Sequence, residues 1–132
     1  TIRKYLVAHP EEIKEILHHN ESFIFFEWTA THGAIGNLGR ELTAGRSIAV
    51  DQHCFPAGSL AFLRSRKPVQ NGAIINWVPL ERFVLVQDTG SAIRGPGRID
   101  LFWGSGQKAG LAAGRMKEDG TLYFLLLKKQ FL

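Results

Sequence analysis

The spacing of hydrophobic residues changes once along the chain, from a helical to a strand-like pattern. In residues 10–19, Ile13, Ile16 and Leu17 fall on one face of a helix, and Pro10 suits its first turn. Short apolar runs then recur between glycine-rich turns, at residues 23–28, 47–50, 60–63, 83–87, 99–103 and 122–127. The pattern predicts an N-terminal helical segment over residues 1–22 and a mainly β domain over residues 23–132.

Three further segments refine this picture. Residues 107–117 carry small and apolar residues at helical spacing, which predicts a short helix. Asp119-Gly120 after it is a turn signal before the last strand. Residues 67–79 are weakly patterned, and we expect them to form a connection. Many short strands with one helix before the last strand favour a small β-barrel over a sheet of βαβ units.

Composition and charge narrow the class of protein. The chain has 132 residues, which suits one domain, and no apolar run approaches the roughly 20 residues of a membrane span. Its net charge of +4 is spread along the chain and does not form a basic stripe with aromatic residues. We therefore expect no nucleic-acid partner. The chain starts without Met or a signal peptide, which indicates a trimmed or processed piece. Cys54 is the single cysteine, and its interpretation is a small buried apolar residue.

Three aspartates stand beside apolar runs and glycines. Asp51 follows the run at 48–50, Asp88 follows the run at 84–87, and Asp100 opens the aromatic run that follows it. A single Asp after a strand is ordinarily a turn former that hydrogen-bonds to its own backbone. Three aspartates in the same context favour a shared site over three separate turns.

The motifs around these aspartates are specific. They are Arg46-Ser47-Ile48-Ala49-Val50-Asp51, Phe55-Pro56-x-Gly58, Gln87-Asp88-Thr89-Gly90-Ser91-Ala92-Ile93-Arg94-Gly95 and Asp100-Leu101-Phe102-Trp103-Gly104. In this order they resemble the C-terminal, three-aspartate domain of the membrane-bound lytic murein transglycosylase A family. Upstream, Phe25-Phe26 and residues 36–46 are similar to the same family, so the resemblance covers residues 5–127.

The resemblance implies a fold and an activity. The fold is a six-stranded double-psi β-barrel with an N-terminal helix and a short helix before the last strand. In that family a second domain is inserted in the barrel's N-terminal half, so the missing N-terminal part of the enzyme or a second chain would complete the cleft. The partner is peptidoglycan, whose bond between N-acetylmuramic acid and N-acetylglucosamine is cleaved to a 1,6-anhydromuramic end, without metal or cofactor. The implied location is the periplasm, at the outer membrane.

The family motif also implies the roles of individual residues. Asp100 is the single carboxylic acid that protonates the glycosidic oxygen and then, as a carboxylate, takes the proton of the sugar's 6-hydroxyl. Asp88 and Asp51 are the supporting pair, which keeps the acid protonated or holds its loop. The apolar residues around Asp100 predict an apolar setting for the acid. The sugar subsites are expected at Gly90, Ser91, Ala92, Ile93 and Phe102.

Three alternatives remain open. Asp88-Thr89-Gly90 after an apolar strand reproduces the aspartic-protease signature, but it leaves the motifs of Asp51 and Asp100 unexplained. Asp51, His53 and Cys54 could contribute to a metal site, but their tight spacing needs further ligands from elsewhere in the chain. The third alternative is a barrel that binds glycan without cleaving it.

Overall fold

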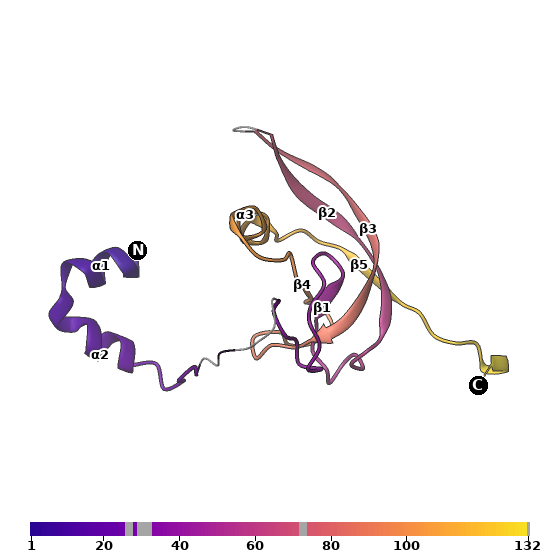
Figure 1. Ribbon diagram of the computed structural model, residues 1–132, viewed down its shortest axis with the longest axis horizontal. Helices are drawn as coiled ribbons and strands as arrows, with labels where there is room; N and C mark the ends of the chain where they lie inside the picture. The colour runs from indigo at the N-terminus through magenta and orange to yellow at the C-terminus, as the bar shows by residue number, and fades with distance from the viewer. Residues whose placement is uncertain (26–27, 29–32, 72–73, 132) are drawn as a thin grey trace. The chain divides into compact units, whose positions relative to one another are not determined.

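The N-terminal part of the chain forms a helical unit of its own. The computed structural model describes residues 1–25, 28, 33–71 and 74–131. It divides into two compact units, Thr1–Ala30 and Thr31–Leu132. The first contains α1 (Ile2–Ala8), η1 (Pro10–Glu12) and α2 (Ile13–His18), so the helix predicted from residue 10 is confirmed (Figure 1).

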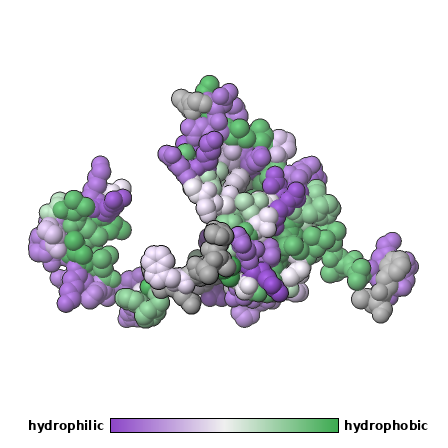
Figure 2. All heavy atoms as spheres, viewed as in Figure 1, coloured by the Kyte–Doolittle hydropathy of each residue, from purple (hydrophilic) through white to green (hydrophobic). Residues whose placement is uncertain are grey.

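Helix α1 was not predicted, because its apolar residues do not form a buried stripe. Ile2 and Val7 are 74% and 76% exposed, and Figure 2 shows green apolar atoms on the surface of this unit. Local contacts hold the first turns together. The Tyr5 ring stacks on His9 at 4.2 Å between centroids, and the Tyr5 hydroxyl donates to Glu12. No helix in the described part of the chain is long and apolar enough to cross a membrane.

The second unit is built on one mixed sheet with the strand order β4-β1-β3-β2-β5 (Figure 1). Strand β1 runs parallel to β3, and the other neighbours are antiparallel. Within the described residues the sheet has five strands and is open, so the predicted six-stranded closed barrel is not reproduced there. The strands are β1 (Ser47–Ala49), β2 (Leu60–Asn71), β3 (Ile74–Asp88), β4 (Asp100–Leu101) and β5 (Thr121–Phe124).

Strands β2 and β3 form a long twisted hairpin (Figure 1). Its register runs from Leu60 opposite Leu85 to Asn71 opposite Ile74. The expectation that residues 67–79 form a connection is therefore wrong for residues 67–71 and 74–79, which belong to β2 and β3. This outer part of the hairpin buries little apolar surface, with Ile74 66% exposed, so paired main-chain groups hold it and the sequence carries little alternation.

The core lies where β1, β2 and β3 meet. In β3, Val84 and Val86 are buried whereas Phe83 and Leu85 are exposed, as expected for alternate faces of a strand. The helix predicted before the last strand is confirmed as α3 (Gln107–Arg115). The buried core residues are Ile48, Val50, Ala61, Leu63, Leu80, Val84 and Val86.

Cys54 and the strand expected at residues 23–28 differ from the prediction where the structure describes them. Cys54 is exposed, and so does not occupy a buried apolar site. It lies in the turn after Asp51, where its main-chain N–H donates to the Asp51 carbonyl. In the strand expected at 23–28, residues 23–25 and 28 belong to no strand, and residues 26–27 lie outside the described residues.

Candidate functional site

The sheet register places Asp88 and Asp100 in one row. Ala49 of β1 pairs with Asp100 of β4 on one side and with Asp88 of β3 on the other. Because neighbouring strands lie about 4.8 Å apart, the two Asp Cα atoms are roughly 10 Å apart. The residue between them is an alanine, whose small side chain leaves space over the sheet.

A cavity of about 380 Å³ lies at this row. Asp88 and Asp100 line it together with the loop that follows β3. Seven of the eight predicted site residues therefore share one cavity, although they come from separate segments of the chain. These seven are Asp88, Gly90, Ser91, Ala92, Ile93, Asp100 and Phe102.

Asp51, the eighth, does not line this cavity and is buried, with 7% of its surface exposed. Its Oδ1 accepts the main-chain N–H of His53 at 3.0 Å, and its Oδ2 accepts that of Gly95 at 2.7 Å. Gly95 has a φ of 73°, a conformation that glycine adopts without strain. Asp51 thus ties the turn after β1 to the end of the loop after β3.

These hydrogen bonds predict a pH dependence of stability. The N–H groups of Gly95 and His53 hold the pKa of Asp51 below its ordinary value, because they favour the carboxylate. A lowered folded-state pKa gives stability that is present above about pH 4 and is lost as the pH falls through the folded value. In Asp51→Asn that contribution is absent at every pH.

We therefore expect the wild type to unfold at a higher temperature than Asp51→Asn at pH 6. The difference between the two unfolding temperatures should become smaller as the pH falls below about 4. Thermal unfolding of the two proteins in parallel, from pH 6 to pH 2.5, measures it. A gap that stays constant over this range would show that the ionised carboxylate is not what holds the loop.

The setting of Asp100 differs from the apolar one predicted. Its side chain is 51% exposed and forms an ion pair with Arg98. The adjacent Ile99 and Leu101 instead pack against the core, because successive side chains of an extended segment point to opposite faces. The ion pair raises the pKa of Arg98. Arg98 was not predicted from the sequence. It lies two residues before Asp100, and residues at this spacing in an extended chain place their side chains on the same face.

The loop around Gly36 and Asn37 holds the Asp88 side chain. Its Oδ1 accepts the main-chain N–H of Asn37 at 3.0 Å. Gly36 beside it lies close to the end of β3, where an added Cβ would meet the Gln87 carbonyl oxygen at 2.5 Å. The loop around Gly36 therefore needs glycine to approach the strand and fix Asp88.

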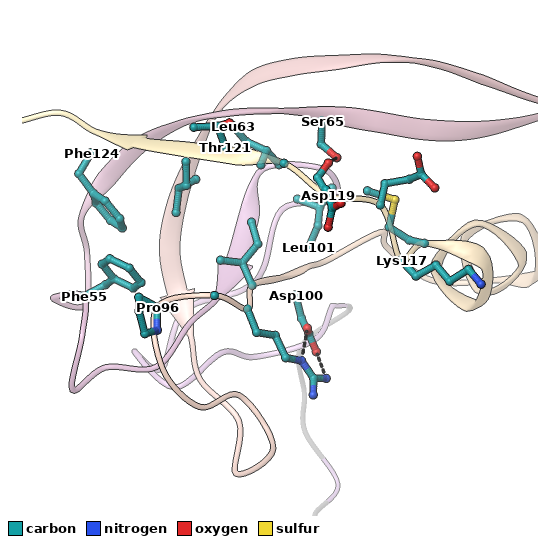
Figure 3. Close-up of a pocket in the computed structure, with 17 residues that line it drawn as sticks. Phe55, Leu63, Ser65, Pro96, Asp100, Leu101, Lys117, Asp119, Thr121 and Phe124 are labelled. Atoms are coloured by element: carbon teal, nitrogen blue, oxygen red, sulfur yellow. Dashed lines mark hydrogen bonds and ion pairs between the residues drawn. The ribbon is translucent and has the colours of Figure 1, made fainter.

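A second cavity, of about 680 Å³, lies on the other side of Asp100. Figure 3 shows Phe55 and Phe124 at one end of it, Lys117 towards the other, and Asp100 with dashed lines marking its ion pair. The two phenyl rings stack at 4.6 Å. Arg98, Asp100 and Leu101 line both cavities, so the carboxylate faces two continuous stretches of surface.

Two of the alternative chemistries can be compared with this geometry. An aspartic-protease centre needs two carboxylates about 3 Å apart; since β1 separates Asp88 from Asp100, a second copy of the chain would have to supply the partner of Asp88. The described residues contain no group of three or more His, Cys, Asp or Glu side chains arranged to hold a metal ion. Asp51 uses both oxygens on backbone N–H groups. The cavity with Asp100 is thus the arrangement that these residues support.

Comparison with known proteins gives consistent matches. The family model described as 3D domain matches residues 46–126. Membrane-bound lytic murein transglycosylase A of Vibrio cholerae is 32% identical over 130 residues, which covers 96% of this chain and 34% of that protein. The chain therefore spans about a third of the length of the curated relatives that it matches.

Solved structures agree with this. MltA from Neisseria gonorrhoeae matches with a TM-score of 0.75 and 37% identity, over 95% of this chain and 31% of that chain. Escherichia coli MltA with bound chitohexaose matches with a TM-score of 0.72 and 26% identity, over 93% of this chain and 37% of that chain. The resemblance predicted from the motifs is confirmed, and the chain belongs to the 3D domain family.

Proposed function

We propose that this chain carries the catalytic centre of a lytic transglycosylase that cleaves the glycan strands of peptidoglycan. The observation that carries the proposal is the cavity shared by Asp100 and the loop at residues 90–93. Gly90, Ser91 and Ala92 in this loop have small side chains, so polar backbone groups can reach a sugar there. The names of the relatives, murein transglycosylases and an MltA with bound chitohexaose, support a glycan as substrate.

Asp100 acts in both steps of the proposed reaction. Its carboxylic acid gives a proton to the glycosidic oxygen as the bond from that oxygen to the anomeric carbon of N-acetylmuramic acid breaks. The sugar's own 6-hydroxyl then attacks the anomeric carbon and loses its proton to the Asp100 carboxylate. The acid is restored, no water is consumed, and the product has a 1,6-anhydro end. An internal nucleophile reacts at a high effective concentration, up to roughly 10⁵ M or more.

The other two aspartates support Asp100 in different ways. Asp88 lines the same cavity from the strand on the other side of β1, and we propose that it places a second negative charge there. Asp51 lies outside the cavity and fixes the loop through Gly95. We propose that Asp51 is a positioning residue, and that Gly90, Ser91, Ala92, Ile93 and Phe102 bind the sugars.

We propose that the open sheet is completed into the six-stranded double-psi barrel by the remaining part of the enzyme or by a second chain. The partial coverage of the relatives supports this. Residues 23–132 would then be the catalytic barrel domain and residues 1–22 a helical segment before it. The names of the membrane-bound relatives support a place in the bacterial envelope, in the periplasm at the outer membrane.

Digestion of purified murein sacculi by the intact protein tests this proposal. We expect soluble muropeptides that carry 1,6-anhydromuramic ends, detected by mass spectrometry. A protein that binds sacculi but releases no muropeptide would leave only the non-catalytic glycan-binding alternative. Cleavage of a peptide substrate that pepstatin inhibits would instead support the protease alternative at Asp88.

A further inference from the structure

One guanidinium holds both oxygens of Asp100. Arg98 Nε lies 3.1 Å from Oδ1, and Nη2 lies 3.1 Å from Oδ2. The third nitrogen, Nη1, donates to the carbonyl oxygen of Ala92 at 3.0 Å. The planar fork of arginine suits such two-point binding of a carboxylate. Arg98 therefore connects Asp100 directly to the loop at residues 90–93.

This contact opposes the first step of the reaction. A guanidinium that donates to both oxygens stabilises the ionised carboxylate and leaves no proton on it to give away. The closed pair therefore opposes proton transfer from Asp100 to the glycosidic oxygen.

Resting on the proposed function, we propose that Arg98 is a positioning residue whose ion pair with Asp100 opens when a sugar occupies the loop at residues 90–93. The link is the carbonyl of Ala92, for which an N–H or hydroxyl of the sugar competes with Arg98 Nη1. Opening lets Asp100 take up a proton for the first step, and the pair closes again when the product leaves the loop. Binding of the glycan and protonation of the acid are thereby coupled.

Other charged groups near Asp100 make weaker contributions. Asp88 at the end of β3 lines the smaller cavity, and Lys117, Glu118 and Asp119 between α3 and β5 line the larger one. Among the described residues, Arg98 is the cation within ion-pair distance of Asp100. Removal of Arg98 should therefore dominate the change in the ionisation of Asp100.

The pH dependence of kcat/KM reports the free enzyme, whereas that of kcat reports the complex with substrate. In Arg98→Gln the alkaline limb of kcat/KM should move to higher pH, because the acid loses the cation that pairs with its ionised form. The alkaline limb of kcat should stay in place, since the pair is already open in the complex. Arg98→Lys keeps the charge and should leave both limbs near those of the wild type.

Lys108→Gln is the matched control, because it removes the same charge from the exposed face of α3. Both limbs should remain unchanged in it. Equal movement of the kcat and kcat/KM limbs in Arg98→Gln would mean that the pair stays closed in the complex and would overturn the proposal. The proposal would also fail if the alkaline limbs of kcat and kcat/KM stayed in place while Arg98→Gln and Arg98→Lys lost activity equally. Arg98 would then have a purely structural role.

A titration without turnover separates this proposal from the proposed function. The ¹³C carboxyl signal of Asp100, identified by its loss in Asp100→Asn, is followed with pH in the intact protein. Saturating chitohexaose should raise the titration midpoint in the wild type but not in Arg98→Gln. A midpoint that does not respond to bound chitohexaose overturns the Arg98 proposal, even if anhydro products form. Failure to bind chitohexaose or murein at all contradicts the glycan function.

Discussion

Asp100→Asn is expected to abolish the release of anhydro-muropeptides while the protein still folds and binds murein. The substitution preserves the size of the side chain but removes the proton that both steps use. General acid–base catalysis is worth about 10² to 10⁴ in rate, and here one group serves twice, so the loss should fall at the upper end. Product release from sacculi, measured by mass spectrometry, gives the rate. Binding is measured separately, by sedimentation of the protein with sacculi.

Two variants make this result specific. Asp88→Asn should lower the rate less than Asp100→Asn, because Asp88 acts only through its charge. Glu81→Gln makes the same chemical change in an exposed ion pair with Arg64 on the hairpin and should leave the rate within about twofold. The assignment of Asp100 fails if purified Asp100→Asn keeps more than a tenth of the activity of the wild type.

The largest effect on stability is expected for Ile48→Ala. Ile48 is fully buried at the centre of the core, on the strand that lies between Asp88 and Asp100. Truncation of a buried Ile to Ala costs about 2 to 5 kcal/mol, from lost burial and from the cavity that remains. For a domain of this size we expect the unfolding temperature to fall by roughly 10 °C or more. Thermal unfolding of the intact protein, followed by circular dichroism, measures the change.

Two further substitutions, a smaller one at Ile48 and one at an exposed leucine, check that lost burial causes the loss of stability. Ile48→Val removes one methyl group and should cost about 0.5 to 1.5 kcal/mol. Leu126→Ala, at a position that is 88% exposed, should change stability by less than about 0.5 kcal/mol. If Ile48→Ala cost no more than Leu126→Ala, the core would not lie where β1, β2 and β3 meet.

The sequence was informative where local patterns decide the structure. Pro10 and the spaced apolar residues marked the helix that begins there, and the apolar run before Asp88 marked the end of β3. The hairpin was missed because its outer part pairs through main-chain groups, and Pro68 and Pro79 interrupt the strand pattern.

The motifs pointed to residues that the fold brings together, but not to the surroundings of each residue. The motifs indicated which residues belong together, and seven of them line one cavity. The setting of Asp100 was not predictable from its apolar neighbours, because these turn towards the core and leave the carboxylate to Arg98. Asp51 likewise resembled the other two aspartates in sequence, but its hydrogen bonds place it under the loop and not in the cavity. Such differences depend on strand register and loop contacts, which single motifs do not encode.

The origin of the oxygen at the new sugar end tests the central claim most directly. In the proposed reaction the 6-hydroxyl of the sugar is the nucleophile, whereas retaining and inverting hydrolases use water and a second carboxylate. Murein digested by the intact protein in ¹⁸O-labelled water, followed by mass spectrometry, distinguishes them. We predict 1,6-anhydromuramic ends without label. Reducing ends that carry ¹⁸O would contradict the account and would make Asp88, across the cavity from Asp100, the base or nucleophile of a hydrolase.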